Sequence, residues 1–204
     1  MAALPKAFYD RPTLEVAADL LGMVLVHRPP GSLTAGRIVE VEAYIGEGDP
    51  ACHAAAGPTR RNAPLYGPPG LAYVYLNYGI HFLFNVVTEA EGRPAAVLIR
   101  ALEPIEGLDV MRARRAPDRS GREVPGHELC RGPGSLTRAM GITLADNLAD
   151  LTRPRLCVED RGAGPPRASI VWTPRIGISA GTDRRWRCYV KGSAAVSGTP
   201  RHRT

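Results

Sequence analysis

Hydrophobic residues occur along this chain mostly in short runs that alternate with polar residues, rather than at the spacing of long helices. Alternation with a period of two is typical of a strand with one buried face, and a short unbroken apolar run is typical of a fully buried strand. These patterns predict a β-hairpin over residues 73–87 and strands over residues 23–27, 37–44, 95–101, 155–159, 175–179 and 187–191.

Helical patterns are fewer and short. They predict helices over residues 14–21, 104–115 and 135–140. Thr13 is placed to cap the first of these helices, and Gly22 to end it. Pro104 suits the first turn of the second helix, where the missing N–H of proline costs nothing.

The order of these elements indicates one domain over residues 1–204. Many strands with few helices between them predict an α+β fold, built on a curved, largely antiparallel β-sheet with short helices around it. The basic stretch 112–122 is expected to be an exposed loop, and residues 198–204 are expected to form a frayed tail.

The composition is that of a globular protein, with 44% hydrophobic and 23% charged residues. The 22 glycines and 19 prolines imply many turns, which excludes a bundle of long helices. No apolar run approaches 18 residues, and the first ten residues lack the apolar core of a signal peptide. We therefore expect no membrane partner and a cytoplasmic location.

Cysteine and histidine do not occur at the spacing of a metal site. The pair Cys52-His53 has no partners at ligand spacing, so no metal is expected. Scattered cysteines without a Cys-x-x-Cys pair predict buried thiols in a reducing compartment, at Cys52, Cys130, Cys157 and Cys188.

The charge balance is basic. Lysine and arginine together number 26 against 20 acidic residues, and only Lys6 and Lys191 are lysines. Guanidinium groups bind phosphate with two hydrogen bonds, so the arginine excess is consistent with a nucleic-acid partner. A GC-rich genome, which encodes arginine in place of lysine, explains the excess equally well.

Two carboxylates share one face of the predicted strand 37–44. A two-residue period points Glu40 and Glu42 the same way, about 6.5–7 Å apart at the backbone. A solvated strand face is one interpretation. Tyr44, the glycine-rich turn after it and His53 favour the wall of a polar pocket that holds an acid/base carboxylate. The same alternation places Ile38 and Tyr44 on the glutamate face and, on the other face, Val39, Val41 and Ala43.

The predicted hairpin has an aromatic residue near its tip. Asn77-Tyr78-Gly79 has the residue types of a tight turn. Proteins that act on duplex DNA place such rings as wedges between base steps. The alternative is that Tyr78 folds back onto its own hairpin. Alternation predicts that Tyr73 and Tyr75 share a face, as do, on the returning strand, His81, Leu83 and Asn85.

Two further features are consistent with a DNA backbone. Arg60 and Arg61 precede the aromatic hairpin, where they fit a surface that follows phosphates. Gly132-Pro133-Gly134 opens the third predicted helix, whose free N–H groups can bind a phosphate.

These motifs, in this order, resemble the alkyladenine (3-methyladenine) DNA glycosylase family. The resemblance runs from about residue 8 to residue 193 and implies a single mixed α/β domain on a curved antiparallel sheet. The matching strings are GRIVEVEAYIGEGDPACHA (36–54), TRRN (59–62), GLAYVYLNYGIHFLFNVV (70–87), VLIRALEPIEGLD (97–109), ELCRGPGSLTRAMGI (128–142) and RIGIS (175–179).

The resemblance implies the catalytic roles. Glu42 corresponds to the general base that deprotonates the attacking water, and Arg100 and the main-chain carbonyl of Ile176 to groups that help hold that water. The resemblance also implies that Ser135 replaces a frequent lysine, so that one phosphate contact is either lost or moved to Arg138.

The resemblance implies the base-binding roles as well. Tyr44 corresponds to one side of the slot for the flipped purine, with His53 and Tyr75 on the other side. Tyr78 corresponds to the intercalating side chain, and Asn85 to the residue that rejects the 2-amino group of guanine.

The resulting hypothesis is a monofunctional DNA glycosylase that acts as a monomer on double-stranded DNA containing damaged purines, without a cofactor. The scarcity of lysine disfavours a Schiff-base lyase. Two alternatives are a noncatalytic nucleic-acid-binding module, such as a tRNA-binding domain, and a hydrolase of free nucleosides. A pure binding module has no use for Glu42 beside Tyr44, His53 and Arg100, and a nucleoside hydrolase has no use for Tyr78 at an exposed turn.

Overall fold

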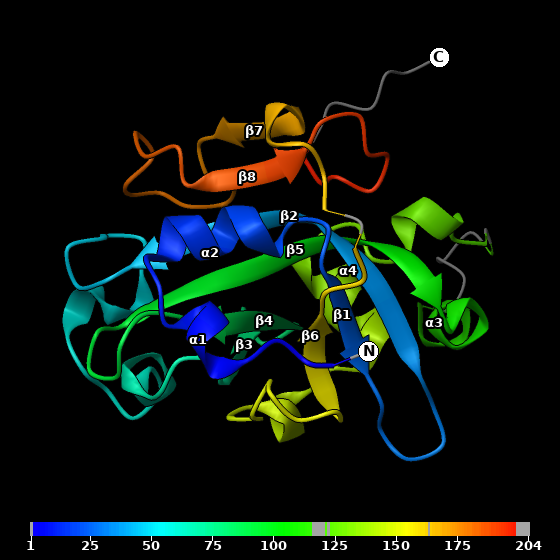
Figure 1. Ribbon diagram of the computed structural model, residues 1–204, viewed down its shortest axis with the longest axis horizontal. Coiled ribbons are helices and arrows are strands. Elements are labelled where there is room, and N and C mark those ends of the chain that lie inside the picture. The colour runs from blue at the N-terminus through cyan, green and yellow to red at the C-terminus, as the bar shows by residue number, and fades with distance from the viewer. Residues whose placement is uncertain (1, 116–120, 122, 163, 199–204) are drawn as a thin grey trace.

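The computed structural model describes residues 2–115, 121, 123–162 and 164–198 (Figure 1). The helices are α1 (Lys6–Tyr9), α2 (Thr13–Leu20), α3 (Leu108–Arg115) and α4 (Pro133–Met140). The strands are β1 (Val24–His27), β2 (Thr34–Ile45), β3 (Ala72–Asn77), β4 (His81–Val87), β5 (Ala95–Glu106), β6 (Leu156–Glu159), β7 (Ile170–Thr173) and β8 (Arg187–Val190).

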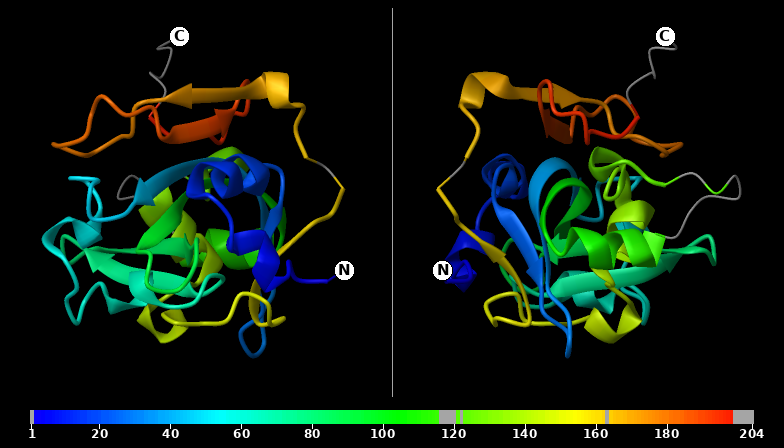
Figure 2. Two further views of the ribbon diagram at one scale, coloured as in Figure 1. Left: turned by 60° about the vertical axis from the view of Figure 1, so that its left-hand side comes forward. Right: turned by 90° about the vertical axis from the view of Figure 1, so that its right-hand side faces the viewer.

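All eight strands belong to one antiparallel sheet in the order β3-β4-β5-β2-β1-β6, with β8 paired to β2 and to β7. β2 and β5 are long enough to run the length of the sheet. One edge of β2 pairs with β1 over its first part and with β8 over Glu40–Glu42. The β7–β8 pair therefore leaves the main sheet and forms a separate layer (orange in Figures 1 and 2). The predicted α+β class on a largely antiparallel sheet is confirmed.

The main hydrophobic core lies between one face of the sheet and helices α2 and α4. α2 reaches it because its buried residues recur at helical spacing, at Thr13, Val16, Ala17 and Leu20. The opposite face of the sheet carries the polar residues of strands β2–β5. The candidate site lies on that second face.

Three predictions from the sequence are wrong: the strand over residues 175–179, the helix start at Pro104 and the helix cap at Thr13. Residues 175–179 are an irregular segment, because Gly177 has φ 76° and Ile176 bonds a side chain instead of a strand. Pro104 lies inside β5, next to a register shift that tolerates its missing N–H. Thr13 is the first residue of α2 and not its cap, because its hydroxyl bonds Thr88 and Glu89.

The other predicted elements are present with shifted ends, whereas α1, β7 and the short 3-10 helices were not predicted. α4 begins at Pro133, two residues before the predicted start. Within the predicted loop 112–122, residues 112–115 are the last turn of α3, and residues 116–120 and 122 lie outside the described part. The predicted frayed tail also lies outside it, except for Gly198.

The predicted faces of β2 are correct for the glutamates and wrong for Ile38 and Val39. Ile38 packs in the main core, and Val39 packs with Ala101 on the other face. Register shifts between β2 and β5 on both sides of Glu40 break the two-residue period there. Glu40 and Glu42 still face the same way, because both bind Arg100.

Candidate active site

Glu42 lies in β2, and its side chain is fully buried. The backbone N–H of Ile176 donates to Glu42 Oε1 at 2.7 Å. Arg100 Nη1 and the Tyr44 hydroxyl donate to Oε2 at 3.0 and 2.9 Å. These hydrogen bonds offset the cost of removing the carboxylate from water. The interpretation of the glutamate face as solvated is therefore wrong.

Both side chains that bind Oε2 keep their protons. Burial and the neighbouring Glu42 carboxylate raise the pKa of Tyr44, so its hydroxyl stays a donor. Burial by itself lowers the pKa of Arg100, but the attraction of Glu42 and Glu40 outweighs it and raises that pKa overall. Glu42 is thus held by two groups that stay protonated across the neutral range.

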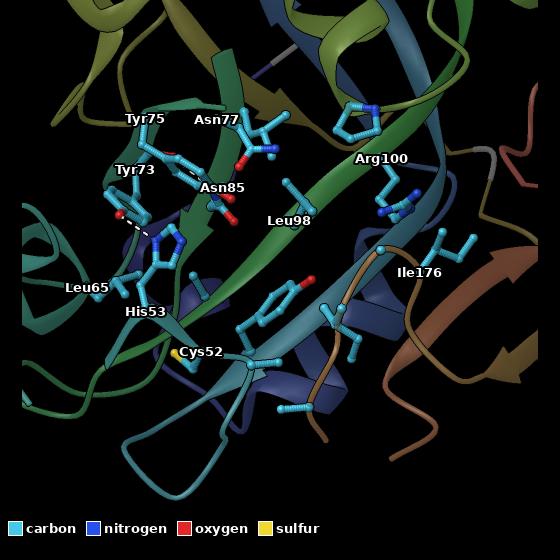
Figure 3. Close-up of a pocket in the computed structure, with 18 of the residues that line it drawn as sticks. Cys52, His53, Leu65, Tyr73, Tyr75, Asn77, Asn85, Leu98, Arg100 and Ile176 are labelled. Atoms are coloured by element: carbon cyan, nitrogen blue, oxygen red, sulfur yellow. Dashed lines mark hydrogen bonds between the residues drawn. The ribbon is translucent and has the colours of Figure 1, made fainter. Parts of the chain in front are cut away.

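All three donors to Glu42 line one cavity of about 480 Å³ (Figure 3). They come from three parts of the chain: Tyr44 from β2, Arg100 from β5 and Ile176 from the segment after β7. Leu98 and Asn85, from β5 and β4, line it as well. The Asn85 amide is buried and donates to the Tyr73 carbonyl at 3.1 Å, which fixes its orientation.

A wall of aromatic rings lines the cavity across from Arg100 and Ile176 (Figure 3). His53 opens the short helix η1 (His53–Ala56) and meets the Tyr75 ring edge-on, with 4.5 Å between ring centroids. Its Nδ1 lies 2.9 Å from the Tyr73 hydroxyl. Burial and the nearby Arg61 lower the pKa of His53, which favours the neutral ring at neutral pH. The predicted set Tyr44, His53, Tyr75 and Asn85 thus lies around one cavity.

Sequence reasoning missed a buried ion pair beneath the site. Arg175 binds both carboxylate oxygens of Asp49, at 2.5 and 2.7 Å, and donates to the Ala43 carbonyl. Both side chains are fully buried. The guanidinium also lies over the Tyr44 ring, 4.7 Å from its centroid, where the cation is attracted to the ring face. Arg175 therefore fixes the ring of Tyr44 and places the adjacent Ile176.

The tip of the β3–β4 hairpin points into solvent. Tyr78 is 87% exposed and has a positive φ of 49°, which is unusual for a residue other than glycine. The alternative in which its ring folds back onto the hairpin is therefore wrong. Ile80 is also exposed at this tip, which the sequence analysis did not predict. The predicted faces of the hairpin are confirmed, since Tyr73 pairs with Asn85 and Tyr75 with Leu83.

The basic positions surround the hairpin and α4. Arg60 is exposed, whereas Arg61 donates to the Leu76 carbonyl and lies over the Tyr75 ring at 5.6 Å. Gly134 lies in the first turn of α4, where a Cβ atom would come within 2.7 Å of His81. Arg138, on the last turn of α4, is exposed and donates to the Arg114 carbonyl.

Comparison with known proteins identifies the family. The sequence matches the family described as "Methylpurine-DNA glycosylase (MPG)" over residues 7–194, nearly its whole length. The chain belongs to this family. It is therefore a DNA glycosylase, a hydrolase of N-glycosyl bonds, which confirms the enzyme class predicted from the sequence.

Close relatives of this methylpurine-DNA glycosylase carry one name, "Putative 3-methyladenine DNA glycosylase". The protein from Methanocella arvoryzae is 54% identical over 97% of this chain and 96% of its own length. The protein from Methanoculleus marisnigri is 51% identical over 95% and 98%. The protein from Chlorobium phaeobacteroides is 48% identical over 97% and 96%.

Three general properties of this glycosylase bear on the expectations from sequence. All four cysteines are free and buried, as predicted. Across the described residues, no cluster of three or more His, Cys, Asp or Glu side chains is arranged to hold a metal ion. No helix in the same part of the chain has the length and hydrophobicity to cross a membrane.

Proposed function

We propose that this enzyme flips alkylated or deaminated purines out of duplex DNA and hydrolyses their N-glycosidic bond with a water molecule activated by Glu42. It acts as a monofunctional glycosylase and starts base excision repair. The names of its relatives support 3-methyladenine as one of its substrates. One observation carries the proposal: the three donors that hold the buried Glu42 carboxylate also line a cavity with aromatic walls.

Oε1 is the oxygen of Glu42 that we assign to the water. It accepts one hydrogen bond from the described residues, that of Ile176, whereas Oε2 accepts two. A carboxylate oxygen has two lone pairs, so Oε1 can accept a proton from a bound water. The Ile176 carbonyl, next to the amide that holds Oε1, is expected to be a second acceptor for that water.

Hydrolysis of an N-glycosidic bond passes through a sugar with oxocarbenium character. A carboxylate beside the sugar stabilises this positive charge and takes the proton of the attacking water. A purine that is alkylated to a cation leaves readily, so no covalent intermediate is needed. Among the described residues, no lysine lines the cavity, and a Schiff-base route therefore has no nucleophile there.

The cavity walls suit a flat base. Tyr44 would lie on one side of the purine, and His53 and Tyr75 on the other. A neutral His53 stacks on a cationic purine without charge repulsion. Stacking accepts different purines because every base has a π face. Asn85, which donates to the Tyr73 carbonyl, would exclude the 2-amino group of guanine.

The exposed hairpin tip is suited to hold the duplex open. Tyr78 would fill the space that the flipped nucleotide leaves, as aromatic wedges do in other proteins that distort DNA. Arg60, Arg61, the first turn of α4 at Gly134 and Arg138 would contact phosphates on either side of it.

Substitution of Tyr78 by serine tests the wedge. We expect Tyr78→Ser to weaken binding to a duplex with an abasic-site analogue by about tenfold to hundredfold, because one stacked ring contributes about 1–3 kcal/mol. Binding to single-stranded DNA should change little. Tyr78→Phe, which keeps the ring, is the matched control and should bind like wild type in a fluorescence anisotropy titration. Equal losses on both substrates would contradict the wedge.

The proposed function is tested by base release from duplexes that each contain 3-methyladenine, 7-methylguanine, hypoxanthine or ethenoadenine. We expect the wild-type enzyme to release free base from at least one of them and to leave the strand uncut until alkali is added. EDTA should not slow the reaction, because no metal has a role in the proposed mechanism. Chromatography of the released base and denaturing gels of the strand measure the two products.

Three results would contradict the proposal. Binding without base release would favour a noncatalytic module, and equal turnover of free modified nucleosides would favour a nucleoside hydrolase. Strand cleavage without alkali would indicate a lyase, which the site does not explain.

A further inference from the structure

Glu40 is a second fully buried carboxylate that the proposed reaction leaves without a role. It accepts four hydrogen bonds. Arg100 Nε, Arg187 Nε and the Ser197 hydroxyl donate to Oε1 at 2.9, 2.7 and 2.9 Å. The Ser197 backbone N–H donates to Oε2 at 2.6 Å. Glu40 thus joins β2, β5, β8 and the segment 193–198 at one point.

The guanidinium of Arg100 uses a different nitrogen for each of its partners. Nε binds Glu40, Nη1 binds Glu42 and Nη2 binds the Ser197 hydroxyl at 3.2 Å. Because the guanidinium is planar and rigid, the contacts of Nε and Nη2 determine where Nη1 points. The donor that Arg100 offers to Glu42 is therefore aimed by Glu40 and Ser197.

The segment 193–198 is tied down independently of Glu40. The Ser193 hydroxyl donates to Glu103 at 2.6 Å, and Arg131 Nε donates to the Val196 carbonyl at 3.0 Å. Arg187 Nη2 donates to the Ser197 carbonyl at 2.9 Å. These contacts hold Ser197 against Glu40 and Arg100.

We propose that Glu40 is a positioning residue for catalysis: it holds Arg100 against Glu42, balances the charge of Arg187, and depends on Ser197 for its own place. The proposal rests on the proposed role of Glu42. Two carboxylates, Glu40 and Glu42, face two guanidiniums, Arg100 and Arg187, so the formal charges of the cluster cancel.

Stability alone is a weak reason for such a cluster, because buried ion pairs can often be replaced by apolar side chains without loss of stability. Glu159 of β6 shows what a structural pair looks like in this protein. It is also buried, and it binds Arg28 and Arg161 at 2.8 and 2.9 Å. Its arginine partners are not those of Glu42, whereas Glu40 shares Arg100 with Glu42, which makes Glu159 a matched control.

Removal of the Glu40 charge has a defined consequence for Glu42. Glu40→Gln keeps an acceptor for Arg100 and Arg187 but leaves the cluster with one positive charge in excess. That charge favours the ionised form of Glu42, which makes Glu42 a weaker base. The charged or titratable groups that face Glu42 are Tyr44 and Glu40 of β2, Tyr75 of β3, Arg100 of β5, Arg187 of β8 and Arg175 after β7.

The experiment measures single-turnover base release against pH, on the lesion duplex that the wild type processes fastest. We expect Glu40→Gln to lower the maximal rate by about tenfold to hundredfold, since small displacements of catalytic groups have effects of this size. The acid limb of the pH–rate profile should move to lower pH. Affinity for the lesion duplex should stay within a few-fold of wild type. Glu40→Asp keeps the charge and should keep the acid limb in place.

Controls separate this role from stability and from the role of Glu42. Glu159→Gln should lower the unfolding temperature but leave rate and pH profile unchanged. If Glu40→Gln does not fold, Ser197→Ala decides the matter: it should slow base release several-fold, and an unchanged rate overturns the proposal. A wild-type rate and acid limb in folded Glu40→Gln also overturns it. Retained activity in Glu42→Gln would instead overturn the proposed function.

Discussion

Glu42→Gln is expected to bind lesion DNA and release no base. A glutamine has no basic oxygen for the water and no charge beside the sugar cation, so we expect single-turnover base release to fall by a factor of about 10³ or more. Binding should stay within a few-fold of wild type, because the aromatic walls of the cavity and the hairpin tip are unchanged. Single-turnover chromatography and an anisotropy titration measure the two quantities on the same lesion duplex.

The geometry also predicts that the Glu42→Gln substitution lowers the stability of the fold. In the Glu42→Gln variant the amide oxygen can accept from Arg100 and Tyr44, but the amide NH₂ group then faces the N–H of Ile176, which is also a donor. A modest loss of stability is therefore expected, and the assay must be run well below the unfolding temperature of the variant. If the folded variant released base at the wild-type rate, Glu42 would not be the base.

Asp49→Asn is expected to remove much of the stability of the fold. The change leaves Arg175 buried and charged without its carboxylate, and the loss of one partner of a buried pair costs about 3–5 kcal/mol. Chemical denaturation at pH 7 measures this difference. Asp10→Asn, at an exposed carboxylate, is the control and should change the free energy of unfolding by less than about 0.5 kcal/mol.

The stability difference should shrink in acid. Burial alone would raise the pKa of Asp49, but hydrogen bonds from Arg175 and from backbone amides lower it overall. A carboxyl group with a lowered pKa in the folded state stabilises the protein above its unfolded pKa, near 4, and loses that contribution as the pH falls through the folded value. The amide that replaces this carboxyl group in Asp49→Asn does not titrate. A stability difference that stays constant from pH 7 to pH 2 would contradict this account of the pair.

Strand patterns in this sequence predicted the elements that bear the site, because alternation is a local property. The hairpin, its two faces and the shared direction of Glu40 and Glu42 follow from it. The prediction failed at Ile38 and Val39, where register shifts on both sides of Glu40 break the period. It failed again at residues 175–179, which alternate apolar and polar residues. There Arg175 binds the Asp49 side chain and the Ile176 N–H binds the Glu42 side chain, in place of strand pairing.

Residues of the candidate site were predicted where their type and local context indicate a chemical role. They were missed where the site depends on contacts between residues far apart in the sequence. Tyr78, His53 and Glu42 stand out as residue types in their local context. Arg175 and Asp49 lie 126 positions apart, and Glu40 and Ser197 lie 157 apart. Among 26 basic residues, no local pattern distinguishes the arginines that become buried partners.

The contact between Glu40 and Ser197 has a consequence for the order in which the site is completed during synthesis of the chain. Translation proceeds from the N-terminus, so Ser197 leaves the ribosome after every other group of the site. Until then, a nascent chain lacks the serine whose backbone N–H and hydroxyl donate to Glu40. A polypeptide that stops short of residue 197 would therefore lack two of the four donors to Glu40.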